Sequence, residues 1–107
     1  MNYTATLPVV LQKNEVHNNS QVILKVYRVK ASFCFSINCK LGRFIRSYYP
    51  TPQGEIFQNT QDAQAAAISM LKSWVSNNRN AKKKLADFAL IEYRQPELFR
   101  FDDINLV

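Results

Sequence analysis

The sequence predicts an α+β fold in which an antiparallel sheet of about four to five strands packs against one main helix, at about residues 60–77, on one of its faces. Two patterns support this fold class. Apolar and polar residues alternate over residues 31–40, as in a half-buried strand, and apolar residues recur every three or four positions over residues 63–74, as in an amphipathic helix. Because the 107 residues contain no repeat or long linker, we expect a single domain spanning residues 1–107.

The first strands are expected before residue 40. Residues 4–12 favour extended structure, and Pro8, which has no N–H to donate, places this stretch at an edge of the sheet. Residues 14–20 (NEVHNNS) have the composition of a loop. Residues 21–39 favour strand structure throughout, with a bend or bulge near residues 29–31 that separates two pieces.

A hairpin is predicted to lead into the last strand before the helix. Lys40-Leu41-Gly42 favours the reversal, and residues 43–49 (RFIRSYY) favour the strand. The prolines and the glycine of residues 50–54 (PTPQG) then predict a turn.

The main helix has the clearest signals in the chain. Asn59 or Thr60 caps its start, and Asp62 complements the positive end of the helix dipole. Its apolar stripe is formed by Ala63, Ala67, Met70, Leu71 and Trp74. Because Trp74 shares that stripe, we expect its ring to lie against the sheet.

The remaining residues are predicted from shorter patterns. After Asn77-Asn78, residues 79–84 (RNAKKK) begin either a loop or a short second helix through Leu85. Residues 88–94 (FALIEYR) favour a strand, residues 94–97 a turn into LFRF, and residues 102–107 form an acidic end.

Positive charge is concentrated in the first half of the chain. Residues 1–50 contain seven Lys and Arg residues against one acid, Glu15, whereas residues 51–107 contain seven of each sign. Charge segregated in this way favours polyanionic partners and accelerates the encounter with them.

Cations and aromatic residues also interleave between residues 25 and 49, a combination that single-strand binders use to contact phosphates and stack bases. The predicted contact residues are Lys25, Arg28, Lys30, Arg43, Arg46, Tyr48 and Tyr49, with Lys82, Lys83 and Lys84, next to Arg79, as a second basic patch that could reach the same ligand. Alternation places Arg43 and Arg46 on opposite faces of a strand, so both reach one ligand only if Arg43 lies at the hairpin rim. Alternatively, the cations only solubilise an outer face, while Phe33, Phe35 and Phe44 belong to the core.

Catalytic and metal-binding groups are scarce. The one histidine, His17, lies in a polar stretch, and Cys34 and Cys39 match no usual zinc spacing. On one strand these cysteines would point to opposite faces, so we expect reduced thiols in a cytoplasmic protein. The N-terminal residues lack the pattern of a secretion leader, and no apolar run approaches the ~20 residues of a membrane span. We therefore expect no catalytic site, metal, cofactor or membrane association.

Two short segments resemble nucleic-acid-binding families. Three strands followed by a helix containing Ala63-Gln64-Ala65-Ala66-Ala67 resemble the latter part of double-stranded RNA-binding domains, which open this helix with phosphate-binding lysines where Gln61, Asp62 and Gln64 stand here. Ile45-Arg46-Ser47-Tyr48-Tyr49, followed by Gly54-Glu55, is similar to a strand and turn of the single-stranded-DNA-binding transcriptional coactivators. The match covers about a dozen residues, without that family's lysine- and glycine-rich segment before the helix.

Together these patterns predict a small, basic, non-catalytic protein that binds single-stranded or structured nucleic acid through a basic and aromatic sheet surface. The alternative is a phage- or mobile-element-type protein that binds and inhibits a host protein, such as a nucleic-acid enzyme. The same charge serves both functions. The sequence does not distinguish them, nor does it indicate an oligomeric state.

Overall fold

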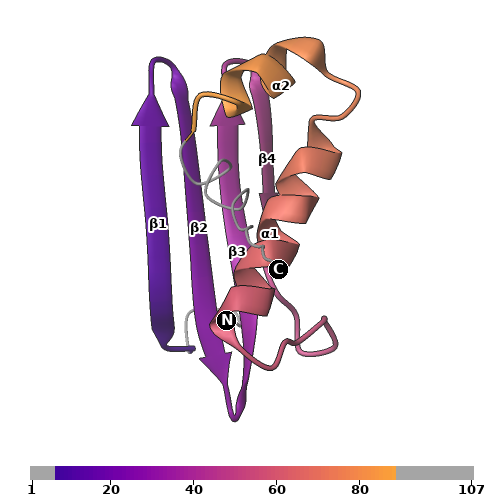
Figure 1. Cartoon of the computed structure of the whole chain (residues 1–107). Coiled ribbons are helices and arrows are strands. Elements are labelled where there is room, and N and C mark those ends of the chain that lie inside the picture. Colours follow the sequence, from indigo (N-terminus) through magenta and orange to yellow (C-terminus); the bar gives the residue numbers. More distant parts are fainter. Residues whose placement is uncertain (1–6, 89–107) are drawn as a thin grey trace, which may run out of the picture.

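The computed structural model describes residues 7–88, and it confirms the predicted α+β class. Four strands form one antiparallel sheet in the order β1-β2-β3-β4, so every strand pairs with its neighbour in sequence (Figure 1). The elements are β1 (Val9–His17), β2 (Ser20–Val29), β3 (Ser32–Leu41), β4 (Phe44–Tyr48), α1 (Thr60–Trp74) and α2 (Arg79–Leu85). The strand predicted at residues 88–94, apart from Phe88, and the turn predicted at residues 94–97 lie outside the described residues.

Each of the three hairpins is closed by only two residues, the first of which has a positive φ. These first residues are Asn18 at 55°, Lys30 at 57° and Gly42 at 65°. Two-residue loops with a positive φ at the first position match the right-handed twist of the strands they join. The connections are therefore tight, and the sheet has two well-defined ends.

Two predicted boundaries are wrong at these hairpins. Residues 14–17 belong to β1 and not to a loop, because they pair with residues 20–23 of β2 and leave only Asn18 and Asn19 to close the turn. Residues 29–31 do not form a bend or bulge. The chain reverses completely there, since Val29 pairs with Ser32 across a loop made of Lys30 and Ala31.

The sheet has an inner face, which carries the core, and an outer face on the opposite side. Paired residues of neighbouring strands share a face, and successive residues of one strand alternate between faces. The inner face contributes the buried residues Val22, Leu24, Val26, Phe35, Ile37, Cys39 and Leu41. On the outer face, buried Tyr27 and Ser36 satisfy each other through a hydrogen bond of 2.9 Å between their hydroxyl oxygens.

Helix α1 crosses the inner face over β3 and β2 (Figure 1). Its start is capped by Asn59, whose Oδ1 accepts a hydrogen bond of 2.8 Å from the backbone N–H of Asp62. The helix ends at Trp74, three residues before the expected end at residue 77. Beyond it, the backbone N–H of Ser76 donates to the carbonyl oxygen of Ser73, so the chain turns more tightly than an α-helix. Trp74 is half-buried against the core, which confirms the prediction that its ring lies on the sheet side.

The described helices, α1 and α2, are both too short to cross a membrane.

Residues 79–85 form a helix, which is one of the two alternatives that the sequence left open. The Oδ1 atom of Asn78 caps it by accepting a hydrogen bond of 3.0 Å from the backbone N–H of Ala81. Ala81, Leu85 and Phe88 bury the same side of this segment in the core. Helix α2 is therefore fixed over the end of the sheet that carries the β3–β4 hairpin (Figure 1).

Candidate nucleic-acid interface

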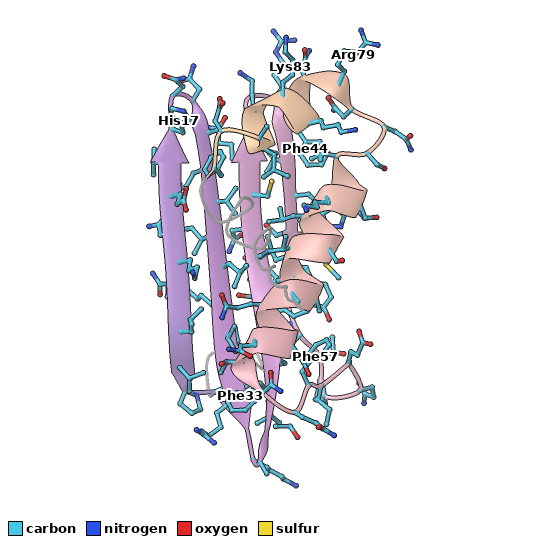
Figure 2. The ribbon with its side chains drawn as sticks, in the orientation of Figure 1. His17, Phe33, Phe44, Phe57, Arg79 and Lys83 are labelled. Carbon is cyan, nitrogen blue, oxygen red and sulfur yellow. The ribbon has the colours of Figure 1, made fainter. Side chains whose placement is uncertain are left out.

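Most of the exposed cationic side chains lie at one end of the sheet, the end that α2 covers. We call this region the basic end and define it by Lys40, Arg43, Arg79, Lys82, Lys83 and Lys84, all of which are exposed. Lys40 lies near the end of β3, and Arg43 lies in the hairpin that follows it. The other four residues come from α2, about 40 residues further along the chain, and Figure 2 shows Arg79 and Lys83 projecting outward there.

The fold explains why α2 presents its cations outward. Ala81 and Leu85, four residues apart, anchor one side of the helix in the core, so the intervening lysines point to solvent. All three lysines, Lys82, Lys83 and Lys84, also lie in the last helical turn, where positive charge complements the negative end of the helix dipole. The same residues thus stabilise α2 and build a rigid basic surface.

A hollow of about 450 Å³ lies between the β3–β4 hairpin and α2. Arg43 and Lys84 line it from opposite elements, together with the amides of Asn78 and Asn80. Gly42 allows this arrangement, because a Cβ atom at that position would lie 2.9 Å from Cε of Lys84. The hollow therefore offers an anion two cationic side chains and two amide groups.

A carboxylate, that of Asp87, lies beside the basic end, where Asp87 lines a surface hollow together with Lys83 and Lys84. Asp87 Oδ2 lies 3.8 Å from Nε2 of His17, and both side chains are about half-exposed. His17 sits at the end of β1 (Figure 2). Its ring makes an edge contact with the ring of Phe88, with 6.2 Å between centroids. His17 and Asp87 thus flank the cations without occupying the hollow between the hairpin and α2.

The structure separates the cations predicted near residue 30 from those near residue 43. Arg28 and Lys30 lie at the opposite end of the sheet, and the length of β3 puts them roughly 30 Å from Arg43. The guanidinium of Arg28 lies over the ring of Phe33, with Cζ 5.1 Å from its centroid. Lys25 lies on the outer face midway along β2.

Arg46 is exposed but occupies the inner-face side of β4. Its pairing with Cys39 puts its side chain beside α1, where its Cζ lies 4.9 Å from the centroid of the Trp74 ring. Arg43, by contrast, lies in the hairpin turn, which is the rim position that it was predicted to need if it shared a ligand with Arg46. The two arginines therefore do not converge on one hollow.

The two tyrosines also lie on different faces. Tyr48 belongs to the inner face and packs against Phe35, with 5.1 Å between ring centroids. Burial, with smaller contributions from Cys34 and Glu55, raises the pKa of Tyr48. Tyr49 lies on the outer face, 46% exposed, and its hydroxyl donates to Oδ1 of Asn38 at 2.9 Å. Of the two side chains, that of Tyr49 is the more exposed to solvent.

The described residues offer little for covalent or metal chemistry. Within residues 7–88, no three His, Cys, Asp or Glu side chains lie together in a way that could hold a metal ion. Cys34 and Cys39 are unpaired and lie on opposite faces, as the alternation predicted. Burial raises the pKa of both thiols, that of Cys39 to about 11, so neither carries appreciable thiolate at neutral pH.

The sequence predicted Arg43, Lys82, Lys83 and Lys84 as contact residues and placed Arg79 beside the second basic patch, but Lys40 was not among the predicted contacts. Lys40 and Arg79 belong to the basic segments 40–43 and 79–84, and only the fold shows that these two segments lie side by side. Searches against protein-family models, curated proteins and solved structures give no match to this chain. The two short resemblances therefore rest on their own residues alone.

Proposed function

We propose that this protein binds nucleic acid, with the basic end neutralising phosphates of the backbone. The observation that carries the proposal is the convergence of six exposed cations, from β3, the β3–β4 hairpin and α2, on one end of the sheet. A phosphate chain passing over such a surface releases its condensed counterions, which supplies affinity without reading sequence.

The shape of the basic end supports this proposal. Cations that only solubilise a protein are normally interspersed with acids, whereas residues 40–43 and 79–84, which supply all six cations of the basic end, contain no acid. The hollow between the hairpin and α2 lets Arg43 and Lys84 approach one phosphate from two sides. The proposal includes a cytoplasmic setting, which the two unpaired cysteines support.

A salt titration with fluorescent oligonucleotides tests the proposal. If about four phosphates of a single strand are neutralised, raising the salt from about 50 to 200 mM should weaken binding by about one to two decades. Replacing Arg43 and Lys83 with alanine should reduce the slope of log K against log salt by about 1.4, which is ~0.7 for each phosphate contact.

The matched control is the pair Arg28→Ala and Lys30→Ala. It removes the same charge from the opposite end of the sheet, so a general field effect would weaken binding equally in both double variants. We expect the control pair to change affinity by less than about twofold, because charges roughly 30 Å away are screened at this ionic strength. Equal losses in the two double variants would contradict the assignment to the basic end.

Binding to an acidic protein is the competing function. It uses the same cations but predicts that no oligonucleotide binds measurably at 50 mM salt while the protein remains folded. That result would reject nucleic acid and favour a protein partner.

A further inference from the structure

The outer face of the sheet carries exposed apolar side chains that the basic end does not explain. Ile45 is 69% exposed, Val16 is 68% exposed and Tyr49 is 46% exposed. Strand pairing places Val16 and Ile45 on the side away from α1, and the hydrogen bond to Asn38 places Tyr49 there as well. Ile45 and Tyr49 lie at the β4 edge of this face, whereas Val16 lies on β1 at the opposite edge, so the β4 side carries more of the exposed apolar surface.

A shallow hollow of about 120 Å³ lies on this face, between β2, β3 and β4. Its walls include two apolar side chains, Ile23 and Ile45, and two amides, Gln21 and Asn38. Lys40, which also belongs to the basic end, lines the same hollow. The hollow is therefore small, partly apolar, and continuous with the proposed phosphate-binding surface.

Hydrogen bonds orient both amides. Asn38 Oδ1 accepts from Ser47 Oγ at 2.7 Å and from the Tyr49 hydroxyl at 2.9 Å, which turns the Nδ2 donor of Asn38 away from β4. Gln21 Nε2 donates to Asn14 Oδ1 at 3.1 Å, which turns the Oε1 acceptor of Gln21 away from β1. The hollow between these strands is thus offered one donor and one acceptor, the pair of groups that an unpaired base edge requires.

Charge decides between a nucleic acid and a second copy of this chain. Lys25 and Lys40 both lie on the outer face, and within residues 7–88 no carboxylate belongs to it, because Glu15 lies on the inner-face side of β1 and the other acids lie outside the strands. Two copies joined through this face would bring lysines toward lysines at a small apolar contact. An anionic strand with apolar bases complements both features.

We infer that the outer face holds an unpaired stretch of nucleic acid, with a base seated in the hollow against Ile23 and Ile45 and its backbone passing Lys40 to the basic end. This inference rests on the proposed function and specifies its ligand as a strand with unpaired bases. A duplex does not fit, because its Watson–Crick edges are already paired and its bases are stacked inside the double helix.

Two probes with equal numbers of phosphates test the inference: a 12-nucleotide thymidine strand and an abasic strand of the same length. Anisotropy titrations at one salt concentration should show the thymidine strand binding about tenfold more tightly, since contact with a base contributes that order of affinity. Ile45→Ala should remove most of this difference and leave binding of the abasic strand unchanged.

Val16→Ala is the matched control, because Val16 is exposed to the same extent on the same face but lies outside the hollow. It should preserve the tenfold preference for bases. Both positions are exposed, so both variants should melt within a few degrees of the wild type.

A wild-type protein that binds the two probes equally would overturn the inference while leaving the proposed function intact. The same follows if Ile45→Ala keeps the preference. A dimer that Ile45→Ala converts to monomer in sedimentation would overturn it in favour of a second copy. Failure to bind either probe would reject the proposed function itself.

Discussion

The side chain of Lys84 in α2 crosses directly over Gly42 in the β3–β4 hairpin. A Cβ atom built on Gly42 would lie 2.9 Å from Cε of Lys84 and 3.4 Å from its Cδ. Gly42 also has a φ of +65°, a conformation that other residues adopt at a cost. One glycine therefore serves the tight turn and also positions a cation at the proposed phosphate hollow.

Gly42→Ala should affect stability and binding by separate routes. The positive φ should lower the free energy of unfolding by about 1–2 kcal/mol, measured by urea denaturation. The added methyl group should displace the flexible Lys84 side chain and weaken oligonucleotide binding severalfold. In a Lys84→Ala background the same substitution should keep its stability cost but have no further effect on affinity. An undiminished effect on affinity in that background would show that Lys84 is not the group displaced.

Arg46→Met should reduce stability and not nucleic-acid affinity. The guanidinium of Arg46 lies over the ring of Trp74 at 4.9 Å, and such an exposed cation–π contact contributes about 0.5–1 kcal/mol. Methionine retains most of the packing of the aliphatic chain, so the loss measures the charge. Chemical denaturation followed by tryptophan fluorescence checks the change in free energy. A large loss of oligonucleotide affinity without any loss of stability would instead return Arg46 to the contact surface.

The thiol of Cys39 should be almost inert in the folded protein at pH 8. Burial raises its pKa to about 11, from an ordinary value near 9.0, so burial alone lowers the thiolate fraction about a hundredfold. The rate of alkylation by iodoacetamide should rise about tenfold for each pH unit up to about pH 11. The urea-unfolded protein is the control, and both cysteines should react in it rapidly at pH 8. Fast alkylation of native Cys39 would show that this part of the core opens.

The sequence predicts those elements whose local pattern matches their burial. Apolar residues, which face the core, alternate with mostly polar residues over residues 32–41, and α1 buries one stripe, so both show a clear period. The second half of β1 shows none, because it is an edge strand whose polar residues, such as Asn14, meet solvent. The reversal at Lys30-Ala31 is also hidden, since neither residue is one that typically marks a turn.

The candidate site is predicted only in part, because pairing across the fold decides which charges meet. Lys30 and Arg43 belong to the same basic stretch of sequence, yet β3 holds them at opposite ends of the sheet. Lys84 lies about 40 residues from Arg43 and lines the same hollow. Charge runs thus indicate the kind of partner, whereas hairpin positions determine the surface that meets it.

Lys30→Gly should stabilise the protein and leave nucleic-acid binding unchanged. Lys30 holds a φ of 57°, which costs a residue with a side chain about 1 kcal/mol or more, and glycine adopts this conformation without strain. Part of that gain is lost because glycine gives the unfolded chain more freedom, so we expect a net increase of about 0.5–1 kcal/mol in the free energy of unfolding. Lys30→Ala removes the same charge but keeps the strain, and it should leave stability close to that of the wild type.

Because the β2–β3 hairpin lies at the far end of the sheet from Arg43 and α2, both variants should bind oligonucleotides as the wild type does (Figure 1). A loss of affinity in both would mean that the ligand extends along the whole length of the sheet.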